Sequence, residues 1–90
     1  MEFVFIKVSD VFNMSFDQVF IAGQLKGQIG FVTPGKWKLF VNGSATADLE
    51  AIGERRGSNT SLTDRVVAFK GQLDKTLFDL HKDEVLLIQQ

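Results

Sequence analysis

The stretch "GQIGFVTPGKWKLFVNG", Gly27–Gly43, contains the clearest turn and strand signals in the chain. The Pro34–Gly35 pair predicts a turn, because proline presets φ and glycine accepts a positive φ. The residues after this turn alternate between apolar and other side chains, as expected for a strand with one face toward a core. We therefore expect Trp37, Leu39 and Val41 to point inward, and Lys36, Lys38, Phe40 and Asn42 to point outward.

Asn42–Gly43 is a favoured two-residue hairpin turn, so the chain is expected to double back after this strand. The next segment, residues 45–56, fits a helix by the spacing of its apolar residues and fits a strand by their alternation. The hairpin turn before it favours the strand. In either case Gly53 is expected to end the element.

Four further segments have strand composition, and polar or glycine-containing turns separate them. They are residues 3–12, 18–27, 65–71 and 84–90, and residues 13–17 form a predicted turn. Gly23 lies inside the second segment and predicts a bulge or a sharp bend. Residues 72–84 are expected to form a loop with one helical turn around Leu77 and Leu80.

These signals predict an all-β fold: a small closed or partly open antiparallel β-barrel of about six strands, with at most one short helical turn. The chain has 90 residues, which suits one domain covering 1–90. Gly23 and the Pro34–Gly35 corner favour a barrel over a sandwich, because closing a sheet requires strands that bend.

The composition excludes several classes of function. The chain has 0 Cys, which excludes a disulfide framework and thiolate chemistry, and its net charge of -1 does not indicate a general polyanion binder. The N-terminal sequence lacks a secretory signal pattern and no apolar run is long enough for a bilayer, so we predict a cytoplasmic protein with no membrane partner.

No motif in the sequence indicates catalysis. His81 is the only histidine, and a charged loop explains it and its neighbours Asp79, Asp83 and Glu84 better than a metal site does. A triad of Ser58 or Ser61 with Asp64 and His81 has no supporting nucleophile motif. The phosphate-binding loop of nucleotide-binding proteins is absent. We therefore predict no enzyme activity, no cofactor, no metal site and no nucleotide binding.

A binding surface is the remaining prediction. Outward phenylalanines interleaved with lysines form either a protein contact or a stacking platform for RNA. The predicted face contains Phe20, Lys26, Lys36, Lys38 and Phe40. A protein partner or a second copy of the chain is the first hypothesis, and RNA is the second because of the net charge. Arg55 and Arg56 form a possible phosphate contact, although a solvated arginine pair explains them as well.

Several segments in order resemble a known domain: "VSDVF", "VFIAGQLKGQI", "PGKWKLFV", "VVAFKG" and "LHKDEVLLI". Together they resemble the β-barrel second domain of the translational GTPases, the family of elongation factor Tu and initiation factor 2. The matching positions are Val11–Phe12, Gly23, Gly27, Gly35, Gly71 and Val85–Leu86. The resemblance implies a free-standing barrel that does no chemistry and contacts RNA or neighbouring domains. It transfers no binding residue, because the matching positions are structural.

Overall fold

The computed structural model describes residues 4–14, 16–27, 32–55 and 64–90, and within them the chain is almost entirely strand. One short 3₁₀ helix, η1, lies between the last two strands at Lys75–Leu77. The strands are β1 (Phe5–Asn13), β2 (Gln18–Lys26), β3 (Gly35–Val41), β4 (Ser44–Arg55), β5 (Asp64–Lys70) and β6 (Val85–Gln89).

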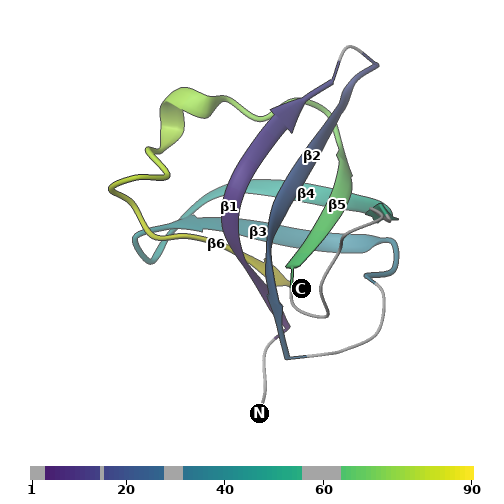
Figure 1. Ribbon diagram of the computed structural model, residues 1–90, viewed down its shortest axis with the longest axis horizontal. Helices are drawn as coiled ribbons and strands as arrows, with labels where there is room; N and C mark the ends of the chain where they lie inside the picture. The colour runs from purple at the N-terminus through teal and green to yellow at the C-terminus, as the bar shows by residue number, and fades with distance from the viewer. Residues whose placement is uncertain (1–3, 15, 28–31, 56–63) are drawn as a thin grey trace.

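The six strands form a ring in the order β1-β2-β5-β4-β3-β6, and every neighbouring pair is antiparallel. Figure 1 shows the ring as two layers, with β1, β2 and β5 nearer the viewer and β3, β4 and β6 behind them. The predicted small antiparallel barrel of about six strands, with at most one helical turn, is confirmed.

The interior of the ring follows the alternation of apolar residues along each strand. Trp37 is 1% exposed and Leu39 is fully buried, whereas Lys36 on the same strand is exposed. The indole of Trp37 packs edge-on against the ring of Phe69 from β5, with centroids 6.2 Å apart. The predicted inward direction of Trp37 and Leu39 is confirmed, and Val41 is partly buried against the same core.

A bulge in β1 lies opposite Gly23, the glycine that predicted a bulge or bend. The β1–β2 register shifts between Val8 and Asp10, and Val8 is the partner of Gly23. A Cβ atom at Gly23 would overlap the carbonyl oxygen of Lys7 and would lie 2.8 Å from Cγ2 of Ile6. Gly23 is therefore required because the backbone of β1 approaches β2 too closely for any side chain.

Residues 44–55 form a strand, as the hairpin signal favoured, and the helical alternative is wrong. The turn residues Asn42 and Gly43 have φ values of 51° and 84°, both in the left-handed region that this hairpin turn requires. Gly53 does not end the element, so that expectation is also wrong. A register shift between Ala51 and Gly53 lets β4 continue to Arg55 while it pairs with β5.

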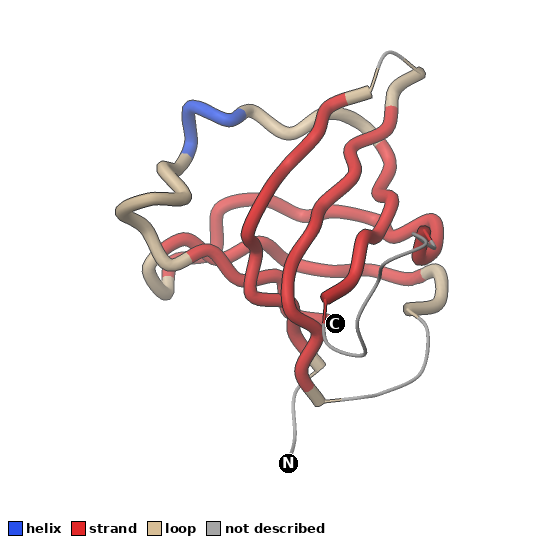
Figure 2. Tube along the Cα trace, viewed as in Figure 1, coloured by secondary structure: helices blue, strands red, loops and turns tan. Residues whose placement is uncertain are grey.

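The connection from β5 to β6 crosses one end of the ring, where Figure 2 shows the short helix in blue. Leu73 of this connection is buried in the core, and the partly buried Phe78 and Leu80 pack against the core. The side chain of Asn13 holds Leu73 in place: its Nδ2 donates to the Leu73 carbonyl and its Oδ1 accepts from the Leu73 amide, both at 2.8 Å. An amide side chain thus replaces a strand neighbour at the end of β1.

A buried ion pair lies inside the ring between β5 and β4. Arg65 Nη1 lies 3.0 Å from both carboxylate oxygens of Glu54, and the two side chains are 6% and 3% exposed. Val32, in the connection from β2 to β3, is also buried. Its backbone amide donates to a carboxylate oxygen of Glu54 at 3.1 Å. The pair and Val32 together fill this part of the interior.

Candidate functional site: two outer surfaces

Four of the five residues predicted to form a binding face lie on one outer surface of the ring. We call this surface the lysine-rimmed face; it is formed by the outward side of β1, β6 and β3 with the end of β2. Its apolar members are Phe5, Phe40, Leu86 and Ile88, all of intermediate exposure, and its lysines are Lys7, Lys26, Lys36 and Lys38.

The strand register puts these side chains in two adjacent rows. In the first row Phe5 of β1 is the partner of Ile88, which is the partner of Lys38 on β3. Lys26 extends this row on the other side of Phe5. Partners on the same face of neighbouring strands have Cβ atoms about 4.5–5.5 Å apart, so these side chains are in contact range.

In the second row the lysine is on β1 and the phenylalanine is on β3, the reverse of the first row. Lys7 of β1 is the partner of Leu86, which is the partner of Phe40 on β3. Across the two rows, leucine and isoleucine therefore occupy the centre, with a phenylalanine and a lysine at each end. An aliphatic centre with charged corners has the anatomy of a protein interface, in which an apolar core is surrounded by a polar rim.

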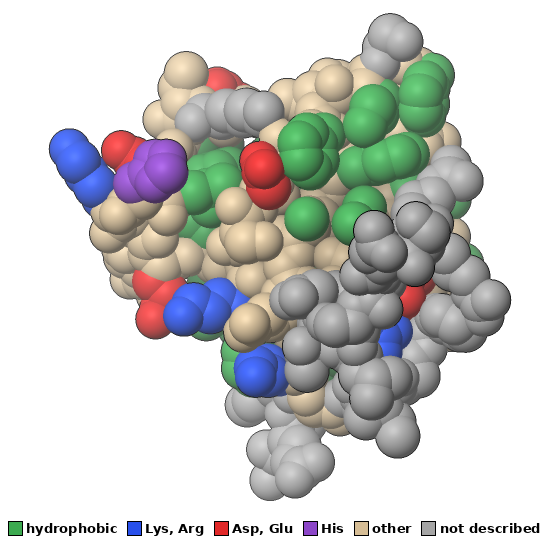
Figure 3. Space-filling model, viewed as in Figure 1, with side chains coloured by type: hydrophobic (Ala, Val, Ile, Leu, Met, Phe, Trp, Pro, Cys, Tyr) green, Lys and Arg blue, Asp and Glu red, His purple; other side chains and the backbone are tan. Residues whose placement is uncertain are grey.

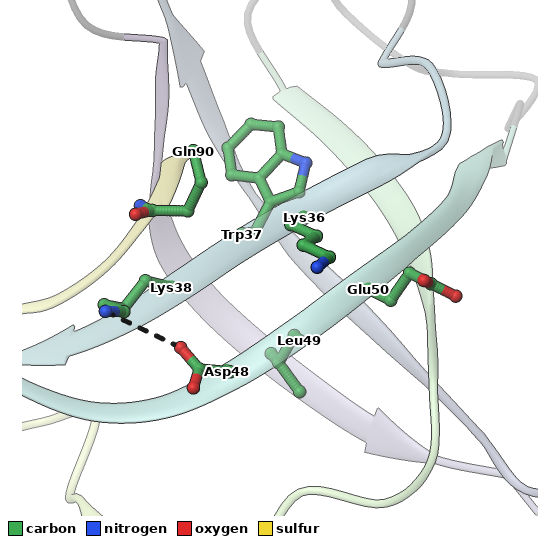
Figure 4. A pocket seen from close by; sticks show the side chains of 7 residues that line it. All are labelled: Lys36, Trp37, Lys38, Asp48, Leu49, Glu50 and Gln90. Atoms are coloured by element: carbon green, nitrogen blue, oxygen red, sulfur yellow. Dashed lines mark ion pairs between the residues drawn. The ribbon is translucent and has the colours of Figure 1, made fainter.

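Acidic residues of β4 neutralise one border of this face. Lys38 Nζ lies 3.8 Å from an Asp48 carboxylate oxygen. The pair lines a depression of about 470 Å³ together with Lys36, Glu50 and Gln90 (Figure 4). In the same view the indole of Trp37 points away from Asp48. Lys36 is the cross-strand partner of Glu50, and its charge helps to lower the pKa of Glu50. Among the described residues, no carboxylate lies within ion-pair distance of Lys7 or Lys26.

Phe20 does not join this surface. It lies on β2, which is three strands from β3 in either direction around the ring, so the side chains of Phe20 and Phe40 leave the barrel in different directions. Phe20 instead packs against Phe16 at a centroid distance of 6.1 Å, and its partner on β1 is Phe12. The single face predicted from the sequence is therefore two surfaces.

We call Phe12, Phe16 and Phe20 the phenylalanine patch. Phe12 is 44% exposed and Phe16 is 56% exposed. Outward neighbours on β2 and β5 extend the apolar surface through half-buried Ala22 and Val66. Figure 3 shows hydrophobic side chains gathered over β1, β2 and β5 in the upper right of the view. Large exposed aromatic side chains that lie together mark a contact surface.

Most of the other sequence candidates cannot be placed in the part of the chain that the structure describes. Ser58, Ser61 and Arg56 lie outside the described residues, as do the side chains of Arg55 and Asp64. His81 is exposed on a turn in which its backbone amide donates to Asp79 at 2.9 Å. Among the residues that the structure describes, no three histidine or carboxylate side chains are grouped so as to hold a metal ion.

The acidic residues of this turn have structural partners. Asp83 accepts hydrogen bonds from the Asp79 amide at 2.8 Å and from the Asn42 side chain at 3.0 Å. These bonds lower the pKa of Asp83, with the Asp79 amide as the larger cause. Asn42 also accepts from the Glu84 amide at 2.9 Å. The turn between β3 and β4 is thereby joined to the start of β6, beside the lysine-rimmed face.

Two surface carboxylates with lowered pKa values likewise have local explanations. The Lys70 ammonium, 2.7 Å from Glu50, lowers the pKa of Glu50 through a hydrogen bond and its charge, and Glu50 raises the pKa of Lys70 in return. Asp74 caps η1, and bonds from the hydroxyl and amide of Thr76 lower its pKa. The largest cause of each shift is a hydrogen bond to a neighbouring side chain, Lys70 for Glu50 and Thr76 for Asp74.

Sequence reasoning missed Phe5, Lys7, Leu86 and Ile88, and also the exposed Phe12 and Phe16. The alternation along residues 5–8 and 85–88 gives the outward direction of the first four, but only the pairing of β6 with both β1 and β3 brings them beside Phe40. Phe12 has the same parity as the buried Ile6 and Val8, and the bulge between Val8 and Asp10 turns it outward.

Within the described residues, the structure has no helix of the length and apolar character needed to cross a bilayer. No family model, curated protein or solved structure matches this chain.

Proposed function

We propose that this protein is a non-enzymatic binding module and that its lysine-rimmed face contacts a protein with an acidic, partly apolar surface. The observation that supports this most directly is the cross-strand order Phe5–Ile88–Lys38 beside Lys7–Leu86–Phe40. The aliphatic side chains at its centre gain by leaving water, and the lysines around them select a partner of opposite charge.

RNA is the second candidate partner. The lysines supply phosphate contacts, and Phe5 and Phe40 offer ring faces on which bases stack. The resemblance to the second domain of translational GTPases is consistent with this alternative. The protein hypothesis ranks first because Leu86 and Ile88, which do not stack with bases, occupy the centre of the face.

A capture experiment tests the protein hypothesis. The wild-type protein, Phe40→Asp and Leu77→Asp are each immobilised and exposed to nuclease-treated extract, and captured proteins are purified and retested singly. Leu77 is a matched control because it is 45% exposed on η1, away from β3 and β6. We expect Phe40→Asp to weaken binding of the purified partner about tenfold or more, and Leu77→Asp to leave it unchanged. Equal binding by all three proteins contradicts the proposal.

A titration with a fluorescent ten-residue oligouridine separates the two partner classes. Binding to phosphates releases counterions, so its affinity falls steeply with salt. Tight, strongly salt-dependent binding that Lys7→Glu and Lys26→Glu abolish would replace the protein hypothesis with the RNA one. We expect no such binding.

A further inference from the structure

The phenylalanine patch has no role in the function proposed above, and its chemistry differs from that of the lysine-rimmed face. The residues in register at its centre are all uncharged: Phe12 is the partner of Phe20, which is the partner of Ala68 on β5, although Ala68 itself is only 1% exposed. The next outward row contains Ala22 and Val66. The centre of this surface offers no cation to a phosphate, which favours a protein as its partner.

Charged side chains flank the patch at two diagonally opposite corners. Asp10 of β1 is in register with Ala22 and is exposed. Lys70 lies at the far end of β5, in register with Gln18, and its side chain is 70% exposed. Phe20 lies midway between the two corners. Along β2 it is two residues from Ala22, the partner of Asp10, and two residues from Gln18, the partner of Lys70. The outer surface is thus apolar at its centre, acidic at one corner and basic at the opposite one.

We propose that the phenylalanine patch binds the same patch on a second copy of this chain. The two copies are related by a twofold axis that lies in the plane of the contact. The axis is perpendicular to the line from Asp10 to Lys70, so each copy's Asp10 lies over the other copy's Lys70. The phenylalanines of the two copies then meet at the centre. The strands of the two copies cross at a large angle, as in orthogonally packed sheets.

The two charged residues can take part without losing their present contacts. One carboxylate oxygen of Asp10 accepts from the Val11 amide at 2.9 Å, which leaves the other oxygen for the partner. Lys70 lies 2.7 Å from Glu50, and an ammonium group has three donors. Because the contact is isologous, each Asp10–Lys70 pair occurs twice, which doubles the effect of changing either residue.

Dimerisation of this kind leaves the lysine-rimmed face accessible. The two surfaces share β1 and β2, in which Phe5, Lys7 and Lys26 lie near one end of the pair and Phe12 and Phe20 near the other. A dimer formed through the patch therefore presents two lysine-rimmed faces, and a partner with two binding segments gains avidity without any new contact. The patch is small, so the contact belongs with weak interfaces, which bury less than about 1,200 Å² in total.

Sedimentation equilibrium up to millimolar protein tests the dimer. We expect the wild-type mass to rise toward twice the monomer mass, and Phe16→Ser to raise the dimer dissociation constant about tenfold or more. Leu77→Ser is the control, because it removes a side chain of similar exposure outside the patch. A wild-type protein that stays monomeric throughout, or dimers that Phe16→Ser does not weaken, overturns the proposal.

Mixing two charge variants tests the proposed geometry. Asp10→Lys alone places lysine against lysine at both corners, and Lys70→Glu alone places glutamate against aspartate. We expect each variant alone to dimerise less than the wild type. An equimolar mixture restores opposite charges at both corners, so we expect heterodimers. Circular dichroism of each variant verifies folding, and folded variants that remain monomeric when mixed contradict the twofold arrangement.

The same variants separate this inference from the proposed function. Phe40→Asp is expected to dimerise normally while it loses the partner, and Phe16→Ser is expected to bind a single-site partner normally while it loses the dimer. Loss of both properties in Phe40→Asp would contradict the separation of the two surfaces.

Discussion

The lysine-rimmed face and the phenylalanine patch both consist of outward side chains on strands of the same ring, yet they differ in chemistry. The first has aliphatic residues between a phenylalanine and a lysine in each row, and the second has phenylalanines at its centre with Asp10 and Lys70 at opposite corners. The neighbouring strands therefore decide which surface an outward phenylalanine belongs to. Phe20 and Phe40 look equivalent along the sequence and belong to different surfaces.

Both surfaces depend on one interior, so the largest expected effect comes from Trp37. Trp37→Ala removes a side chain that is 1% exposed and packs on Phe69, and we expect it to lower the free energy of unfolding by about 3–5 kcal/mol. Phe40→Asp on the same strand is the control and is expected to keep the wild-type fold. Urea denaturation measures both. A stable Trp37→Ala protein, or an unfolded Phe40→Asp protein, would contradict the assignment of Trp37 to the core and of Phe40 to the outer surface.

The buried pair of Arg65 and Glu54 supports β5, the strand that carries Val66 of the patch surface. Arg65→Met leaves the Glu54 carboxylate buried without this partner, and we expect a loss of about 3–5 kcal/mol. The double variant Arg65→Met with Glu54→Gln should recover part of this loss, because glutamine is neutral and still accepts from the Val32 amide. Thermal denaturation compares the variants, and a double variant less stable than Arg65→Met contradicts this explanation.

The end of β1 that carries Phe12 depends on Asn13. Asn13→Ala removes both hydrogen bonds to Leu73, and we expect a loss of about 1–3 kcal/mol because the buried Leu73 backbone is left without them. Amide hydrogen exchange locates the effect. We expect faster exchange near Leu73 and in the second half of β1, with little change in β3 and β6. A uniform change over all six strands would show that the two surfaces cannot be perturbed separately.

The smallest expected effect concerns Asp83, which joins the turn after β3 to the start of β6. Its pKa is below the ordinary 3.8 in the folded protein, so its contribution to stability is present above that value and is lost as pH falls through the folded pKa. We expect Asp83→Asn to have a slightly lower melting temperature than the wild type at neutral pH. This difference should shrink below about pH 3.8. A difference that grows in acid contradicts the assignment.

The alternation of residues was enough to predict the parts of the fold that depend on local geometry. Trp37 and Leu39 point inward, Asn42–Gly43 forms the hairpin turn, and Gly23 lies where two backbones meet. Each of these follows from the alternation of side-chain direction along a strand or from a backbone conformation that few residues accept. Gly53 misled the prediction, because a glycine within a strand can mark a register shift as well as an end.

Only the tertiary structure decided which side chains share a surface. The sequence alone established that this chain alternates as an antiparallel β fold, with a tryptophan inside and lysines outside. It did not reveal that β6 lies between β1 and β3, or that the bulge between Val8 and Asp10 turns Phe12 outward. The physical reason is that the direction of a side chain is set by its own strand, whereas its neighbours are set by pairing between residues far apart in the chain.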